Sequence, residues 1–401
     1  MKKITALVIS LCFCIPTAVS LGACGQSNEG EEKNPNFGMV TPAMPEMPSE
    51  GLEYELNEDG TGYIFKGVGT CMEKNIRIAD EYESLPVVGI AAGAFNMAIE
   101  TVSVTVGANV AEIGLDAFGN LTTVQAFFIA EGNTSYKIMD DSLYTADGSA
   151  IIRYAVDSSR TSYSLPETVK EIKEQAFNGC DYLTSLTIPE GVETIGGSAF
   201  SNCDALTSVH IPASVSLIGG YLTKGSGIVE ISVADGNTAY KSVEGVLYTK
   251  DGKDLLEYPS AKQCDNLILP ETVETVKAES FSWCEYIKSV VFTGNIEYIE
   301  TSAFTHCSAL ESIEFDKLNQ VYIYVKDWAF SDCTELKTIK FGFGWYVIED
   351  TAFNGCTKLS TIDFDEKMEE WEYLMLYKNW LNNIPLEKVI CTDGEISYPI
   401  E

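Results

Sequence analysis

The stretch DYLTSLTIPEGVETIGGSAFSNC, residues 181–203, decides the fold. Leu186 and Ile188 alternate with polar residues, as in a strand with one buried face. Pro189 ends this strand because it has no amide hydrogen to donate. A second apolar pair, a Gly-Gly bend, Ala-Phe200 and a cysteine complete the unit. One unit cannot bury these residues alone, so the pattern indicates a coil that stacks on neighbouring coils.

The unit recurs along the chain. Phenylalanines lie 23 residues apart in pairs, at Phe95 and Phe118, Phe177 and Phe200, Phe281 and Phe304, and Phe330 and Phe353, and all of them except Phe281 follow an alanine. A period of about 20 to 29 residues with an LxxLxI core is typical of a leucine-rich-repeat solenoid. We therefore expect a mainly β, right-handed array of about ten coils with short parallel strands.

A longer repeat of 104 residues relates two inserted segments. They read SLYTADGSAIIRY at 142–154 and VLYTKDGKDLLEY at 246–258. Each contains an Asp-Gly pair between two apolar runs, which is a strong signal for a β-hairpin. Two coils are therefore expected to carry β-hairpin inserts.

The motif LxxIxIPxxVxxIGxxAFxxC and the inserted GNxxYxxxxxxLYxxDG coil resemble the BspA-like leucine-rich repeat family of bacterial surface proteins. The resemblance covers about residues 51–401. It implies adhesion, meaning binding to host matrix or serum proteins or to other cells. The coil at 204–226 departs from the motif, because Tyr221-Leu222 stands where Ala-Phe is expected.

The amino terminus has the features of an export signal. Two lysines and an apolar stretch lead to Leu21-Gly22-Ala23-Cys24, which resembles the lipobox of bacterial lipoproteins. That resemblance implies cleavage before Cys24 and diacylglycerol on its thiol. The alternative is an ordinary signal peptide cleaved nearby. With two or more acyl chains the protein would be stably lipid-anchored to the bacterial cell membrane, facing outward.

Composition and pattern divide the chain into five segments. Residues 1–23 are the expected lipoprotein signal peptide. Residues 24–50, rich in Pro, Glu, Ser and Gly, are expected to be a disordered tether. A β-patterned amino-terminal cap at 51–84 precedes the solenoid at 85–364. Residues 365–401 lose the repeat and are expected to form a carboxy-terminal cap.

Charge and rare residues exclude several functions. The chain has 26 Lys and Arg against 59 Asp and Glu, a formal charge of −33, which excludes nucleic acid as a partner. Its only two histidines, His210 and His306, make a multi-histidine metal site unexpected. We expect no catalytic residue, no metal and no cofactor.

Six cysteines occupy the AFxxC position and would form a ladder through stacked coils. They are Cys180, Cys203, Cys284, Cys307, Cys333 and Cys356. We expect them to be buried as small apolar residues. Disulfides between stacked coils are the alternative, because exported proteins favour them. Zinc is less favoured, since the mature chain contains no CxxC pair.

The candidate binding face is a row of side chains between the last two buried positions of each strand. In chain order the row is Ser103, Phe128, Thr187, His210, Ser232, Val291, Glu314, Lys340 and Asp363. Strand alternation is expected to turn the row outward onto a parallel-sheet face, where solenoids dock extended partners. Two alternatives stay open: a plain solvated face, or binding by the two hairpins around Tyr144 and Tyr248.

The sequence thus predicts a non-enzymatic cell-surface binding protein. Its partner would be an extracellular protein or glycan, and its only contact with the membrane would be the lipid on Cys24. The alternative function is an envelope lipoprotein that serves as a scaffold or as part of a carbohydrate-capturing complex.

Overall fold

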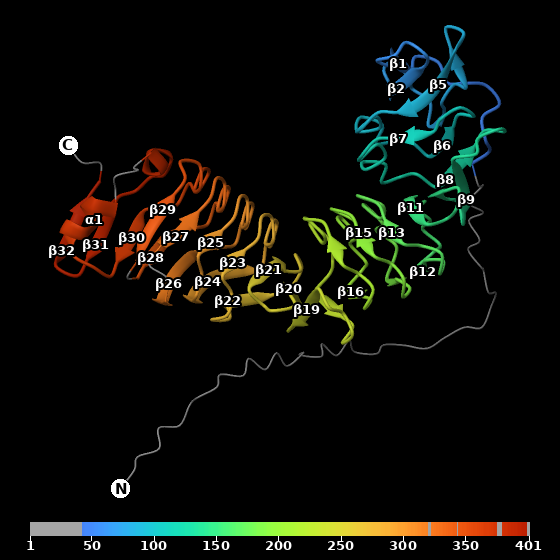
Figure 1. Ribbon diagram of the computed structural model, residues 1–401. Helices are drawn as coiled ribbons and strands as arrows, with labels where there is room; N and C mark the ends of the chain where they lie inside the picture. Colours follow the sequence, from blue (N-terminus) through green and yellow to red (C-terminus); the bar gives the residue numbers. More distant parts are fainter. Residues whose placement is uncertain (1–41, 320–321, 343, 375–378, 399–401) are drawn as a thin grey trace, which may run out of the picture. The chain divides into compact units, whose positions relative to one another are not determined.

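The computed structural model describes residues 42–319, 322–342, 344–374 and 379–398 (Figure 1). These residues form a β-solenoid of about 14 turns with almost no helix, which confirms the predicted fold class. The number of turns is somewhat higher than the ten or so expected. No helix within these residues is long and apolar enough to cross a membrane.

Most turns contribute a strand to each of two walls of the solenoid. The first wall carries the predicted row, and we call it the row face. In chain order it contains β3 (Asn75–Arg77), β6 (Ser103–Val106), β8 (Ala126–Ile129), β12 (Ser162–Ser164), β14 (Ser185–Thr187), β16 (Ser208–Ile211), β18 (Glu230–Val233), β22 (Cys264–Ile268), β24 (Ile287–Gly294), β26 (Ser312–Leu318), β28 (Thr338–Phe341), β30 (Thr361–Phe364), β31 (Lys388–Cys391) and β32 (Gly394–Ser397).

The second wall, which we call the second face, is divided into three sheets. The first sheet contains β1 (Glu53–Leu56), β2 (Tyr63–Gly67), β4 (Glu81–Tyr82), β5 (Leu85–Ile90) and β7 (Glu112–Ile113). The second contains β9 (Tyr136–Met139), β10 (Ser142–Thr145), β11 (Ala150–Arg153), β13 (Glu171–Ile172), β15 (Thr194–Ile195) and β17 (Leu217–Ile218). The third contains β19 (Tyr240–Val243), β20 (Val246–Thr249), β21 (Asp254–Glu257), β23 (Thr275–Val276), β25 (Tyr298–Ile299), β27 (Tyr322–Val325) and β29 (Trp345–Ile348).

The two predicted hairpin inserts begin the second and third of these sheets. β10 pairs antiparallel with β9 and β11, and β20 pairs antiparallel with β19 and β21. The last strand of each insert then pairs parallel with the next coil, β11 with β13 and β21 with β23. Each insert therefore starts a new run of parallel coils, and the buried apolar residues likewise form three clusters.

Stacked aromatic rings fill the centre of the coils, as the repeated Ala-Phe motif predicts. The rings of Phe304 and Phe330 lie 5.0 Å apart and nearly parallel, and Phe353 follows at 5.2 Å. In the insert coils Tyr154 and Tyr258 occupy the same slot and stack on the next phenylalanine at 5.2 and 4.9 Å. Continuous stacking of buried rings explains why each coil needs its neighbour.

The six ladder cysteines are buried free thiols. Sγ of Cys307, Cys333 and Cys356 donates to the backbone oxygen of the phenylalanine one coil earlier, at 3.1 to 3.2 Å. Burial raises the pKa of the Cys284 and Cys333 thiols. The predicted burial is confirmed, and the hydrogen bonds show that the thiols also tie successive coils together.

The ends of the solenoid are covered by different structures. At the carboxyl end, the helix α1 (Met368–Leu374) and the 3₁₀ turn η1 (Asn379–Asn383) bury Trp371 and Trp380 over the last coils. At the amino end, the Ser49 amide donates to Arg77 O at 3.0 Å, so the folded region begins before residue 51. Residues 1–41, including the predicted signal peptide and Cys24, lie outside the described part.

Candidate binding surfaces

Most of the predicted row does lie on the surface of the row face. Thr187 and His210 are exposed, and six others are partly exposed: Phe128, Ser232, Val291, Glu314, Lys340 and Asp363. The strand register brings neighbours of the row side by side, for example Glu314, Lys340 and Asp363 on three adjacent strands. Several members pair with each other. Lys340 Nζ lies 2.7 Å from Glu314 Oε1, and His210 Nδ1 lies 2.9 Å from Ser232 Oγ.

Ser103 does not belong to the row. It is fully buried, and its hydroxyl donates to Asn75 Oδ1 at 2.9 Å. The register pairs Ser103 with Ala126, whereas Phe128 pairs with Thr105, which is also buried. The prediction was therefore wrong by two residues: Thr105, and not Ser103, lies beside Phe128. In TVSVTV both residues occupy the same phase of the alternation, so the pattern cannot distinguish them.

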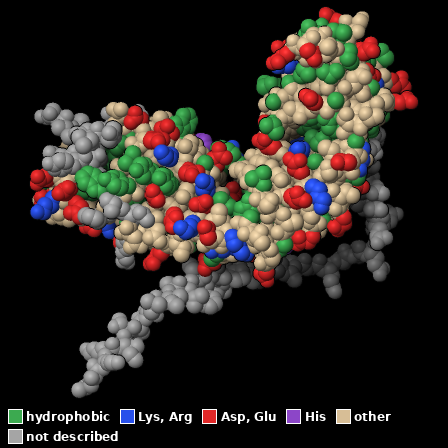
Figure 2. Space-filling model, in the orientation of Figure 1, with side chains coloured by type: hydrophobic (Ala, Val, Ile, Leu, Met, Phe, Trp, Pro, Cys, Tyr) green, Lys and Arg blue, Asp and Glu red, His purple; other side chains and the backbone are tan. Residues whose placement is uncertain are grey.

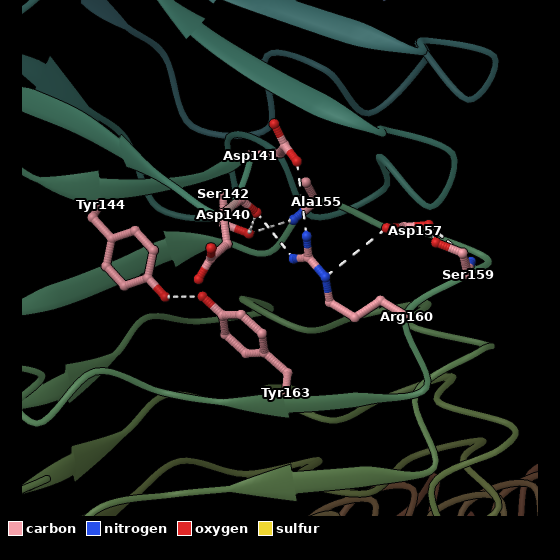
Figure 3. Close-up of polar contacts among 9 residues, drawn as sticks. All are labelled: Asp140, Asp141, Ser142, Tyr144, Ala155, Asp157, Ser159, Arg160 and Tyr163. Atoms are coloured by element: carbon pink, nitrogen blue, oxygen red, sulfur yellow. Dashed lines mark hydrogen bonds and ion pairs between the residues drawn. The ribbon is translucent and has the colours of Figure 1, made fainter. Parts of the chain in front are cut away.

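The hairpin alternative is wrong for both tyrosines. Tyr144 is completely buried and Tyr248 is 5% exposed. Figure 3 shows the Tyr144 hydroxyl pointing at that of Tyr163, at 2.7 Å. Burial and this hydrogen bond raise the pKa of Tyr144, so the phenol stays neutral. These tyrosines hold the inserts in place and have no surface to offer a partner.

Arg160 clamps the first insert to the following loop (Figure 3). Its Nη1 donates to the backbone oxygen of Asp140 at 3.0 Å. Its guanidinium also lies 3.8 Å from Asp141 and 3.9 Å from Asp157, and 5.7 Å above the Tyr163 ring. Because its charge is met by two carboxylates, Arg160 is a structural residue, and this cluster is not a binding site.

The second face carries exposed aromatic residues that the sequence analysis missed. We call Tyr298, Tyr322, Tyr324, Trp345 and Val347, on β25, β27 and β29, the aromatic patch. Tyr322 is 54% exposed and Trp345 43%. Figure 2 shows hydrophobic side chains gathered over β27 and β29, at the left of the molecule. A cluster of large apolar side chains in contact with water is typical of an interaction site.

Parallel pairing holds the patch in register. Tyr322 lies beside Trp345, and Tyr324 lies between Tyr298 and Val347. The rings of Tyr298 and Tyr324 stack at 5.1 Å and 12°. The inward neighbours of these strands, such as Ile323, are buried in the core. The strands therefore hold the patch rigidly, so its side chains would lose little conformational entropy when a partner binds.

Paired charges border the patch. Lys277 Nζ lies 2.7 Å from Glu300, and Lys326 Nζ lies 3.0 Å from Glu349. Glu300, Lys326 and Glu349 directly follow the three patch strands, and Lys277 directly follows the neighbouring strand β23. Together the four residues form a neutralised rim. An apolar centre with a polar rim is the usual anatomy of a protein interface.

A sequence signal for the patch existed. YIYV at 322–325 and WYVI at 345–348 both alternate, with large side chains at the outward positions. Earlier coils have Thr194 and Thr275 at the position of Tyr298. The predicted row contains outward residues of the first strand of each coil only. The patch residues lie on the second strand of each coil, so they fell outside that prediction.

Two kinds of reactive site, a metal centre and a cysteine–histidine pair, are relevant to the described residues. Among the described residues, no group of three or more His, Cys, Asp or Glu side chains could hold a metal ion. His306 Nδ1 lies 3.9 Å from Asp332, and its ring lies 4.5 Å from that of Trp283, tilted by 40°. The adjacent ladder residue Cys307 points into the core, where its thiol bonds to Phe281 O. His306 and Cys307 therefore do not form a nucleophile–base pair.

Comparison with known proteins agrees with this architecture. A leucine-rich cell surface protein of Faecalibacterium prausnitzii is 23% identical, with 86% of this chain and 94% of that chain covered and a TM-score of 0.50. The pneumococcal vaccine antigen PcpA is 21% identical, with 80% and 82% covered and a TM-score of 0.49. No curated protein matches the sequence.

The sequence itself matches the family described as BspA type leucine-rich repeat region, in six copies, over residues 153–242 and 258–391. These ranges span more than half of the chain and include both faces of the last two runs of coils. The chain therefore belongs to the BspA-type leucine-rich repeat family of bacterial proteins.

Proposed function

We propose that this protein is a non-enzymatic bacterial surface protein that adheres to an extracellular protein through the aromatic patch. It would be exported and held at the membrane by lipid on Cys24. The observation that carries the proposal is the exposed, in-register cluster of Tyr322, Trp345 and their neighbours on a rigid sheet. Tyr and Trp are the residues most enriched at the energetic centres of protein interfaces.

The ring geometry favours a protein over a glycan at this patch. Tyr298 and Tyr324 stack on each other, which removes one face of each ring from contact with a ligand. Sugar rings stack on free aromatic faces, whereas protein side chains pack well against edges and hydroxyls. The formal charge of −33 favours a partner with basic surface. Its association should weaken as salt rises, because screening shortens the reach of the field to about 8 Å at physiological ionic strength.

The experiment is a binding screen with matched variants. The mature protein is tested against purified matrix and serum proteins, and each hit is measured again with Tyr322→Ser/Trp345→Ser. About half of each side chain is exposed, so the double variant should keep its fold while its affinity falls at least about tenfold, equivalent to 1.4 kcal/mol. Phe128→Ser and Val291→Ser on the row face serve as controls. Unchanged affinity in the double variant, with loss in the row variants, would move the site to the row face.

A further inference from the structure

The 104-residue repeat builds two equivalent hollows, one beside each hairpin insert. The first has a volume of about 420 Å³ and the second about 410 Å³. We call them the first and second joint hollows. The same repeat positions line both, including Tyr136 and Tyr240, and Thr145 and Thr249. Volumes of this size are in the range of small-molecule sites, roughly 300 to 1,000 Å³.

The two hollows differ in the charge that they bury. Position 153 is an arginine in the first hollow, and the equivalent position 257 is a glutamate in the second. In the second hollow, Glu257 accepts two hydrogen bonds from Thr223, and Lys277 pairs with Glu300 at 2.7 Å. The polar groups of the second joint hollow are thus matched within the protein.

The first joint hollow leaves polar groups unmatched. Arg153 is 1% exposed and donates through Nη1 and Nη2 to backbone oxygens, but its Nε–H has no partner in the protein. Asp116 Oδ1 is also buried and without a partner. The structure describes seven such side-chain atoms, and two of them line this one hollow. Buried polar groups are nearly always satisfied, so a pair left open points to a missing ligand group.

Asp116 has a φ of 57°, in the left-handed region, and so do Ser198 and Tyr221 at the same position of other coils. This backbone conformation is therefore a feature of the repeat. The Asp116 carboxylate packs against Gly119, where a Cβ would come within 1.8 Å of Asp116 Oδ1. In the coil beside the second joint hollow the equivalent residue is Tyr221, so the carboxylate is specific to the first.

We propose that the first joint hollow binds one ring of a neutral carbohydrate. A hydroxyl is the ligand group that can accept from the Arg153 N–H and donate to the Asp116 carboxylate at the same time. Neither atom is in contact with bulk water. Binding therefore requires the partly buried Asp116 side chain to rotate so that its carboxylate reaches the hollow. Tyr136 and Leu115 supply apolar surface for the carbon face of the ring.

The walls of the hollow disfavour a charged ligand of either sign. Glu112 and Glu174 would repel an anion, while Lys173 and Arg153 would repel a cation. A neutral, hydroxylated ring fits this mixture because it can donate to the carboxylates and accept from the cations. This site is separate from the aromatic patch and uses a different class of ligand, so neither proposal depends on the other.

The test is calorimetric titration of the mature protein with free hexoses and neutral hexose oligosaccharides. Oligosaccharides of uronic acid and of glucosamine serve as charged comparators. Asp116→Gly removes the carboxylate and suits the left-handed backbone, so it should fold and lose at least about tenfold in affinity. Leu115→Ser removes a 71% exposed side chain from the hollow and should also weaken binding. Leu217→Ser, which removes a 60% exposed side chain outside both hollows, should not.

Binding to a free hexose would identify a free sugar as ligand, and binding only to oligosaccharides would identify a glycan; both support the proposal. It is overturned if no neutral sugar binds at millimolar concentration, if charged oligosaccharides bind better, or if Asp116→Gly and Leu115→Ser both bind like the unmodified protein. The Tyr322→Ser/Trp345→Ser variant should keep full sugar affinity, which separates this outcome from a failure of the adhesion proposal.

Discussion

Thr223 donates both its amide and its hydroxyl to the same carboxylate oxygen of Glu257, at 2.8 and 2.7 Å. Glu257 ends β21, the last strand of the second insert, and Thr223 belongs to the coil that lacks Ala-Phe. The backbone hydrogen bonds place Leu222 at the alanine position and Thr223 at the phenylalanine position, one residue later than the sequence predicts, so the stack of aromatic rings is interrupted at that coil. A buried hydrogen-bonded carboxylate therefore joins the second and third runs of coils where ring stacking does not.

This buried carboxylate should make stability depend on pH near neutrality. Burial raises the pKa of Glu257 to about 7 from an ordinary value of 4.5, although the Thr223 hydrogen bonds act the other way. The folded state holds the proton more tightly than the unfolded state. The contribution of this group to stability is thus fully present below pH 4.5 and is lost as the pH rises through about 7.

The variant Glu257→Gln removes this titration while keeping the shape of the side chain. We expect its free energy of unfolding to rise relative to the unmodified protein between pH 5 and pH 8, by up to about 3 kcal/mol at 1.36 kcal/mol per pKa unit. Urea unfolding at several pH values measures the difference, and the exposed Glu131→Gln controls for the change in net charge. A difference that stays constant with pH would contradict a raised pKa at Glu257.

Chemical labelling should separate the ladder cysteines from the others. Cys307 and the other five ladder thiols are buried and hydrogen-bonded or closely packed, so they should not react with a thiol reagent in the native protein. Cys71 and Cys264 are partly exposed and should react first. Denaturation without reductant should then expose the six ladder thiols, together with the thiol of Cys391, which is also buried. Failure of these six to appear would indicate disulfides.

The fold was predictable because the repeat encodes it many times over. Each coil repeats the same buried positions, so Phe200, Phe304 and the AFxxC cysteines could be placed from spacing alone. Single positions were less secure. Ser103 was misplaced because only one coil, with an ambiguous alternation, decided its register.

The binding surfaces were harder to predict because they depend on contacts between coils. The Asp116 and Arg153 side chains meet at one hollow only after the hairpin insert has turned the chain. In the aromatic patch, Tyr322 and Trp345 keep the regular spacing of 23 residues on adjacent strands. The three-residue insertion between Phe304 and Phe330 instead hides the alignment of Tyr298 with Tyr324, which are 26 residues apart. Tyr144 and Tyr248 misled in the opposite way, since hairpin tyrosines that look available are buried by the neighbouring coil.

The lipid anchor remains a prediction from the sequence. Cys24→Ser should abolish acylation and move the protein from the membrane fraction to the medium or periplasm, because the thiol is the predicted attachment point. Metabolic labelling with a fatty acid and partition into detergent measure both effects. Cys71→Ser is the matched control, since it removes a partly exposed cysteine of the folded region. Lipid labelling that persists in Cys24→Ser would refute the lipobox.

The aromatic stack should carry much of the local stability. Phe304 lies between two stacked rings at 4.3 and 5.0 Å. Phe200 has one ring neighbour along the stack, Phe177 at 6.0 Å and tilted by 39°, and Thr223 stands at the next phenylalanine position. Both are fully buried, so each Phe→Ala change should destabilise by about 3–5 kcal/mol through the lost ring and its cavity. The cost should be larger at Phe304, because two ring contacts are lost there.

The linear stacking of coils should make the loss of stability in the Phe→Ala variants local. Each coil contacts mainly its neighbours, so the array can open locally without complete unfolding. Hydrogen exchange should therefore quicken most in the coils on either side of the substituted phenylalanine, and less in the coils beyond the nearest insert. Tyr182→Ala, which removes a 50% exposed ring from a surface turn, should change neither exchange nor melting. Melting and exchange like the unmodified protein in both Phe→Ala variants would show that the rings do not hold the coils together.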